Sequence, residues 1–457
     1  MQTENDTGQL GSDKIARLLV RFSVPAITGM LVMATYNIVD TIFVGMLGSE
    51  AIAALSIAFP FQMMLGAFAI GTGVGAASLI SRSLGAGQKE IAQRTVGQVI
   101  TLSVIAGIIV AAAGFLFLRP LLAIFGATPE IMGLTGEYVI VITTGSMMLF
   151  LLMALNNVVR GVGRPTLSMQ IMIISSVVNV VLDPIFIFTL GLGVQGAALA
   201  TVLAKIIGVI IMLHFFITGR GEIKINWSSL IPHSYTIRQI YIIGFPAMIL
   251  QASTNVSLMI ANNILAAYGH LPIAALGLIF RLIMFALMPV IGVSQGLLPI
   301  IGYNYGARKP GRIREAIGKG LFISITVVTF LGVCYFTWPS LFLSIFSREA
   351  ELIELGSYAL RIMVIMFPTI AAQITFTTYF QAAGRGWPSL LLSVLRELLV
   401  FIPLLFIFSG AFGLNGVWIA RPASDLIAFL VTFFLFRREM KMLGSSGQQQ
   451  LARMEEN

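Results

Sequence analysis

The sequence has few of the residues that enzymes and metal sites depend on, with one cysteine and three histidines among its 457 residues. Because Cys334 is the only cysteine, no internal disulfide can form, and cysteine usage does not indicate a compartment. The histidines, His214, His233 and His270, are far apart and lack the spacing of a metal site. No nucleophile, base and acid are grouped as catalysis requires, so we do not expect an enzyme.

Charge is equally scarce, since only 10% of the residues are charged and 57% are hydrophobic. Soluble domains carry about 25% charged residues, so this composition indicates a polytopic membrane protein. The net charge of +9 is spread over short connectors rather than gathered on one face, and we therefore do not expect nucleic-acid binding. The first residues are polar and contain no cleavable signal pattern.

Long apolar segments are abundant. A segment of about 20 apolar residues can cross a bilayer as a helix. Such segments lie at 16–43, 51–80, 95–118, 132–158, 166–189, 194–217, 238–266, 272–300, 316–338, 352–382, 388–409 and 414–436. The sequence therefore predicts an all-α protein with twelve transmembrane helices, embedded in a lipid bilayer.

The connectors between these segments alternate in basic charge. Basic residues gather in every second connector and in the C-terminal tail, at Arg82, Lys89, Arg94, Arg160, Arg164, Arg220, Lys224, Arg238, Arg308, Lys309, Arg312, Arg314, Lys319, Arg385, Arg437, Arg438 and Lys441. The intervening connectors hold only Arg119 and Arg348. By the positive-inside rule, both termini are cytoplasmic in a multi-pass protein of the cell (inner) membrane.

The two halves repeat at one constant offset along the chain. Pro25-Ala26 aligns with Pro246-Ala247, and the glycine pair Gly71 and Gly75 aligns with Gly292 and Gly296. We expect two pseudo-symmetric six-helix lobes with a substrate site between them near mid-membrane, and close helix packing at the glycine pairs. The predicted division is an N-terminal tail at 1–15, a first lobe at 16–217, a linker at 218–237, a second lobe at 238–436 and a tail at 437–457.

Two acids interrupt the apolar segments of the first half. An ionised carboxylate at membrane depth costs at least about 2.5 kcal/mol, so Asp40 and Asp183 must face protein or a water-filled cavity. Tyr36 and Asn37 share the helix face of Asp40, and Asn179 lies one turn before Asp183. These positions have no acidic counterpart in the second half. We predict that the two acids bind the coupling ion of a transporter; the alternative is a structural hydrogen-bonded pair.

The kind of ion stays open. A low-dielectric surrounding favours a protonated carboxyl group, which suits H+. Sodium would require further oxygen ligands, which Asn179, Thr201 and Asn156 can supply. Pro184 removes a backbone hydrogen bond beside Asp183 and predicts a helix bend there.

Two further features have a structural and a functional interpretation. Flexible methionines, including Met33, Met63 and Met284, suit a pocket for varied shapes but also serve as lipid-facing residues. The charges inside the last two predicted spans are expected to form an internal salt-bridge cluster or a second ion or substrate contact. These charges are Arg396, Glu397, Arg421 and Asp425.

Over essentially all twelve spans the sequence resembles the multidrug and toxic compound extrusion (MATE) transporters. The resemblance is closest to the branch with the DNA-damage-inducible and staphylococcal-type multidrug exporters. It is carried by Pro25, Asn37-Ile-Val-Asp40-Thr-Ile-Phe-Val-Gly45, Gly85-Ala86-Gly87, Asn156-Asn157, Arg160-Gly-x-Gly-Arg-Pro165, Asn179-x-x-x-Asp183-Pro184, Gln295 to Ala307 and Gln381-Ala-x-Gly384.

The resemblance implies a V-shaped pair of lobes that exports small cationic amphipathic compounds in exchange for H+ or Na+ by alternating access. It places the ion at Asp40, Asn179, Asp183 and Thr201, with Tyr36, Tyr138 and Asn156 around it, and a helix bend at Pro25. We assign to the substrate cavity Tyr36, Asn37, Tyr138, Asn156, Asn157 and the three methionines Met33, Met63 and Met284. No cofactor beyond the ion is expected, and the protein is expected to be a monomer.

Two other functions remain as alternatives. The first is a flippase for lipid-linked precursors from the same superfamily. A flippase of this kind is expected to have a larger cationic cavity and additional transmembrane spans. The second is a passive channel, which the one-sided pair of acids disfavours.

Overall fold

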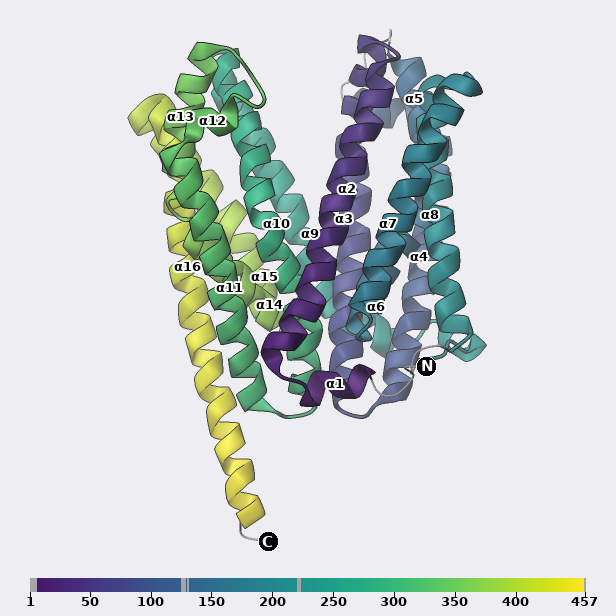
Figure 1. The fold of residues 1–457 in the computed structure, drawn as a ribbon, viewed down its shortest axis with the longest axis vertical. Helices are drawn as coiled ribbons and strands as arrows, with labels where there is room; N and C mark the ends of the chain where they lie inside the picture. The colour runs from purple at the N-terminus through teal and green to yellow at the C-terminus, as the bar shows by residue number, and fades with distance from the viewer. Residues whose placement is uncertain (1–5, 125–128, 130, 220–222, 456–457) are drawn as a thin grey trace. The chain divides into compact units, whose positions relative to one another are not determined.

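The computed structural model describes residues 6–124, 129, 131–219 and 223–455, and these ranges contain helices and no strand. Figure 1 shows the helices as long rods. In the first half they are α1 (Asp6–Ser12), α2 (Ile15–Gly45), α3 (Ser49–Gly85), α4 (Lys89–Ile124), α5 (Met132–Thr144), α6 (Ser146–Gly161), α7 (Pro165–Pro184), η1 (Ile185–Thr189) and α8 (Gly193–Ile217). In the second they are η2 (Trp227–Leu230), α9 (Ser234–Ala266), α10 (His270–Gly306), α11 (Pro310–Thr337), α12 (Pro339–Leu343), α13 (Ala350–Val364), α14 (Phe367–Ala382), α15 (Gly386–Val394), η3 (Leu395–Phe401) and α16 (Ile402–Glu455).

The helices match the apolar segments. Within the described ranges, nine helical stretches are long and apolar enough to cross a membrane, and two bent helix pairs raise the number to eleven. One of the nine, Gly386–Leu443, has 58 residues. A straight helix of that length would span about 87 Å, far more than the ~30 Å of a bilayer core.

This last stretch consists of two antiparallel helices. Gly413 breaks the helical backbone with φ 58° and ψ −138°, a conformation that glycine adopts without strain. Ser424 Oγ donates to the backbone oxygen of Arg396, and Arg421 donates to Glu397. The later residue of the second helix thus lies beside the earlier residue of the first, so the two helices run antiparallel. The stretch holds the two predicted spans 388–409 and 414–436, and the structure has a helix for each of the twelve.

Two spans are bent at corresponding places in the repeat. The pair α5 and α6 bends by 53° at Gly145, and the pair α13 and α14 bends by 50° between Val364 and Phe367. The repeat aligns Gly145 with Met366. In the second bend the proline at 368 has no backbone N–H to continue the helix.

The chain divides into two compact units. Unit 1 comprises Thr28–Met248 and the segment up to Ser12, and unit 2 comprises Asp13–Ile27 and the chain from Ile249 on. The chain passes from one unit to the other inside α2, after Ile27, and inside α9, after Met248. The repeat that aligns Pro25 with Pro246 also aligns Ile27 with Met248. The lobe and linker ranges predicted from the sequence stay a prediction.

The glycine pairs pack as predicted. A Cβ added to Gly75 of α3 would lie 2.1 Å from the backbone oxygen of Ile240 in α9, inside unit 1. A Cβ on Gly292 of α10 would lie 2.3 Å from Ile27 of α2, inside unit 2. Only glycine allows these helices to approach so closely.

The segment before α9 is fixed to α4. The buried side chain of Gln98 donates to the backbone oxygens of Ser229 (2.8 Å) and Ile231 (2.7 Å) and accepts from the backbone N–H of His233 (3.0 Å). Thr101 donates to the oxygen of Leu230. Residues 229–233 of the predicted linker are therefore held on α4 of unit 1.

Candidate functional site: an acidic cluster in unit 1

The predicted ion ligands converge between α2, α7 and α8 of unit 1. Asn179 Nδ2 donates to Asp183 Oδ1 (3.2 Å) within α7 and to Thr201 Oγ1 of α8 (3.3 Å). Asp183 is fully buried, Asn179 is 2% exposed, and Asp40 of α2 is half-buried. We call Asp40, Asn179, Asp183 and Thr201 the acidic cluster.

The two carboxyl groups meet across the helices. The side chains of Asp40 and Asp183 are within hydrogen-bonding reach of each other. Ionised carboxylates only accept hydrogen bonds, so a bond between these two requires a proton on one of them. The arrangement can therefore take up a proton.

The acidic cluster has unused acceptors. Asp40 Oδ1, Asp183 Oδ2 and Asn179 Oδ1 are buried and have no hydrogen-bond partner in the described part of the chain. Buried polar atoms in native proteins are nearly always paired, and an unpaired one is costly. A proton or a bound cation would satisfy these oxygens.

Two tyrosines lie beside the acids. Tyr36 of α2 and Tyr138 of α5 both interact electrostatically with Asp40 and Asp183. Tyr138 is 3% exposed, and its hydroxyl accepts from Gln62 Nε2 of α3 (2.9 Å). The resemblance predicted both tyrosines; Gln62, which orients one of them, was not predicted.

The two asparagines of α6 do not join the acidic cluster. Asn156 Oδ1 accepts from Arg160 (2.6 Å) and from Ser168 (2.8 Å), and Asn157 Oδ1 accepts from Arg160 (2.8 Å). Ser168 lies eleven residues before Asn179 on α7, about 16 Å along the helix. Asn156 and Asn157 therefore form a separate network around Arg160, and their amide oxygens are occupied.

The remaining cavity residues lie in both units. Asn37 and Met33 are exposed on α2, and Met63 is half-buried on α3 of unit 1. Met284 packs against the hydrophobic core of unit 2. Their assignment to a substrate cavity stays a prediction.

The two proline positions differ in local structure. Pro25 lies inside the continuous helix α2, within the part that belongs to unit 2. At Pro184, α7 ends and the wider π-helix η1 begins, where the N–H of Leu190 bonds to the oxygen of Ile185. The backbone hydrogen bonds change from the α-helical to the π-helical pattern directly after Asp183, because Pro184 has no N–H to donate.

The charges of unit 2 are paired with one another. Arg421 makes two hydrogen bonds to Glu397, at 2.9 and 3.0 Å, and Arg396 bonds to Asp425 at 3.0 Å. Arg421 also lies 3.6 Å from Asp425, one turn further along its own helix. Two arginines thus neutralise two buried carboxylates. This is the internal salt-bridge arrangement, and it joins the two antiparallel helices of the last long stretch.

Comparison with known proteins places this architecture in a family. The MatE family model matches residues 25–185 and 246–407, two copies that start at the aligned prolines Pro25 and Pro246. The chain belongs to the MATE family of transporters. It is 30% identical over 427 residues, 92% of this chain and 94% of the relative, to the "Multidrug export protein MepA" of Staphylococcus aureus (strain MSSA476).

Solved structures of MATE transporters have the same fold. A "Crystal structure of MATE in the bent conformation" matches with a TM-score of 0.92 at 27% identity, covering 98% of this chain and all of that one. An outward-facing "multidrug resistance MATE family transporter of the MOP superfamily" matches with a TM-score of 0.90 at 28% identity, covering 97% and 100%. The all-α, polytopic fold class is therefore confirmed, and the chain is a multi-pass membrane transporter.

The sequence interpretation of this MATE chain missed one charged residue. Lys205 of α8 is half-buried and interacts electrostatically with Asp40. It is the only basic residue among positions 194–213 and lies one turn after Thr201. A lysine in the middle of an apolar span was the signal that could have identified it.

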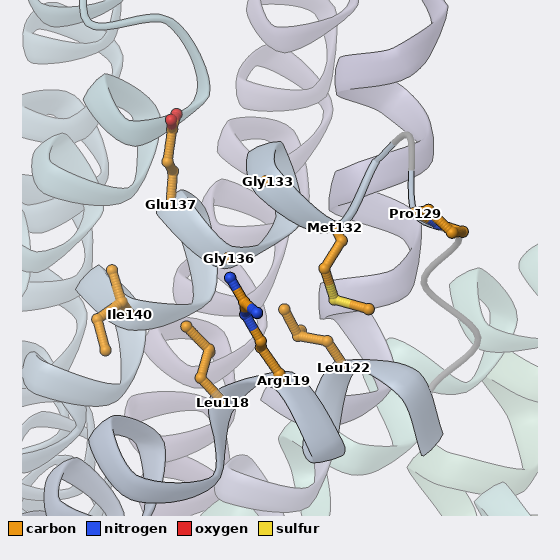
Figure 2. Close-up of a pocket in the computed structure, with 9 residues that line it drawn as sticks. All are labelled: Leu118, Arg119, Leu122, Pro129, Met132, Gly133, Gly136, Glu137 and Ile140. Atoms are coloured by element: carbon orange, nitrogen blue, oxygen red, sulfur yellow. The ribbon is translucent and has the colours of Figure 1, made fainter.

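A cavity lies elsewhere in unit 1, near the ends of α4 and α5. Its volume is about 690 Å³, and Figure 2 shows Arg119 reaching from α4 toward Gly136 of α5. Besides Arg119 its lining has one other charged residue, Glu137. None of the predicted site residues lines it. Across the described ranges, no group of three or more His, Cys, Asp and Glu residues could hold a metal ion.

Proposed function

We propose that this MATE transporter is a secondary active multidrug efflux antiporter. It exports cationic amphipathic compounds in exchange for H+ or Na+, which binds at Asp40 and Asp183, by alternating access. The observation that carries the proposal is the contrast between the units. The buried carboxylates of unit 2 are hydrogen-bonded to arginine, whereas no salt bridge in the described part of the chain reaches Asp40 or Asp183.

Coupling follows from the charge of the acidic cluster. A cationic drug and the coupling ion both favour negative charge, so binding of one weakens binding of the other. The exchange requires that the two ligands favour different states or exclude each other, because tight binding alone shifts no equilibrium. Thr201 and Asn179 hold Asp183 in place for either ligand.

The relatives support the substrate class and the membrane. The Staphylococcus aureus relative is named a multidrug export protein, and it aligns over nearly the full chain. We place the chain in the cell membrane with both termini cytoplasmic, because the basic connectors alternate. We expect it to act as a monomer, since each chain contains both halves of the repeat.

The test is replacement of the acids by amides of the same shape. In cells exposed to a toxic lipophilic cation, Asp40→Asn and Asp183→Asn should lower resistance to that of cells without the transporter. Glu90→Gln, which changes an exposed acid paired only with Arg94, is the matched control and should retain resistance. Membrane expression of each variant is measured by immunoblot.

Wild-type resistance in both aspartate variants would contradict the proposal. Failure of the wild type to move any small cation, together with translocation of a lipid-linked precursor in vesicles, would favour the flippase instead.

A further inference from the structure

Lys205 stands at the centre of a membrane-spanning helix. The helix α8 covers Gly193–Ile217, and position 205 is its midpoint. A lysine at this depth costs at least about 2.5 kcal/mol and is found where it faces a partner or a water-filled cavity. Because Lys205 is half-buried, we expect a negatively charged group near its ammonium.

The geometry of the helix directs this side chain to the acidic cluster. Lys205 lies four residues after Thr201, on the same face of α8, and helical side chains lean toward the N-terminus of their helix. Its ammonium group therefore extends toward the level of Thr201, whose hydroxyl bonds to Asn179. The electrostatic interaction of Lys205 with Asp40 agrees with this direction.

The cluster and the lysine complement each other in hydrogen bonding. Among the residues that the structure describes, Lys205 forms no salt bridge. The cluster holds three buried oxygens without partners, on Asp40, Asp183 and Asn179. A lysine ammonium has three N–H donors and no acceptor. These three donors match the three unpaired oxygens in number and in hydrogen-bonding role.

We propose that the Lys205 ammonium is the resident cation of the acidic cluster and takes the place that a sodium ion would occupy. Transport is then driven by a proton gradient and does not respond to sodium. A sodium ion would have to bind the same oxygens beside a fixed positive charge, which repels it. Asp40 of α2 interacts electrostatically with Lys205, and the titratable groups that interact with Asp40 in turn are Tyr36 on α2, Tyr138 on α5 and Asp183 on α7. This inference rests on the proposed antiport function.

The experiment uses the full-length protein in proteoliposomes with ethidium as the transported cation. A pH gradient at equal sodium and a sodium gradient at equal pH are imposed in turn. The wild type should respond to the pH gradient and show the same initial rate with or without the sodium gradient. In Lys205→Met the ammonium is gone, and the sodium gradient should raise the initial rate by about fivefold or more, the lower end of ordinary coupling between two ligands. Lys205→Arg keeps the cation and should stay insensitive to sodium.

A second measurement does not depend on transport by the variant. Binding of radioactive sodium to purified protein in detergent should be absent in the wild type and saturable in Lys205→Met. Adding Asp183→Asn to that variant should abolish the binding.

The outcomes separate the two proposals. A wild type driven by the sodium gradient, or a Lys205→Met protein that neither binds nor responds to sodium, would overturn the role of Lys205 and leave the antiport function standing. A wild type that transports ethidium under neither gradient would contradict the antiport function itself.

Discussion

The acidic residues inside the two units have different surroundings. In unit 2, Glu397 and Asp425 each face an arginine of the neighbouring helix, and the four charges cancel. In unit 1, Asp40 and Asp183 interact with each other, and Lys205 interacts with Asp40. Carboxylates paired with arginine stabilise a fold, whereas carboxylates without an arginine partner leave room for an ion.

This contrast predicts different effects on stability. Glu397→Gln leaves Arg421 buried with an incomplete partner, and removing one member of a buried pair costs about 3–5 kcal/mol. Asp183→Asn removes a buried negative charge that has no basic partner within 4.0 Å in the described ranges, so it should leave stability unchanged or raise it. Thermal unfolding of the purified variants in one detergent measures both. A Glu397→Gln protein as stable as Asp183→Asn would contradict the assignment of the arginine–carboxylate cluster as structural.

The sequence identified most residues of the acidic cluster because intramembrane acids are rare and stand out. Helix periodicity placed Asn179 beside Asp183, and the family resemblance supplied Thr201 and Tyr138. The sequence could not show that Asn156 belongs to a separate network, because the hydrogen-bond partner of that side chain, Ser168, lies on another helix. The same limit hid Gln62, whose role depends on the hydroxyl of Tyr138 across the helix interface.

At the scale of elements, equivalent bends arise from different residues. The first bend lies at Gly145, whose added Cβ would lie 2.3 Å from Val202, and the second lies beside a proline. Hydropathy predicted both segments as continuous spans, since it detects apolar length and not direction. It also placed span ends inside the true helices: α3 runs from Ser49 to Gly85, against a prediction of 51–80. Polar residues at the ends continue the helix without contributing to the apolar signal.

The glycine contacts give a prediction at this scale. Gly75→Ala places a Cβ against the backbone oxygen of Ile240, which cannot move aside without shifting α9. Such overpacking costs about 1–3 kcal/mol. Gly66→Ala in the same helix is the control, because nothing lies within 4 Å of its added Cβ. Thermal unfolding in detergent should show a lower midpoint for Gly75→Ala alone, and equal midpoints for the two variants would contradict the close approach of α3 and α9.

At the scale of the whole molecule, the duplication was visible in the sequence and organises the structure. A single offset, the one that aligns Pro25 with Pro246, relates the glycine pairs, the two matches to the family model and the two points where the chain changes units. What the sequence did not predict is that α2 and α9 each begin in one compact unit and end in the other. A division read from the sequence can only cut the chain between helices, whereas the compact units are decided by which helices a segment contacts, and that can change within one helix.

Helix α2 has residues in both compact units, which matters for the coupling of ion and drug. Its first part, with Pro25, belongs to unit 2, and its second part, with Asp40, belongs to unit 1. Because α2 is one continuous helix, a change at Asp40 can reach residues of both units along the backbone. The proposed exchange of ion and drug thus acts on an element that both units share.

The most direct measurement of the coupling is the movement of ions driven by drug. Proteoliposomes with an imposed pH or sodium gradient are given ethidium, and decay of the gradient is followed with a fluorescent ion indicator. In the wild type, ethidium should accelerate the decay of the gradient that the acidic cluster uses, whereas vesicles with the Asp40→Asn/Asp183→Asn double variant should behave like protein-free vesicles. Ethidium-driven decay at the wild-type rate in the double variant would show that the ion is carried elsewhere, and the account would be wrong.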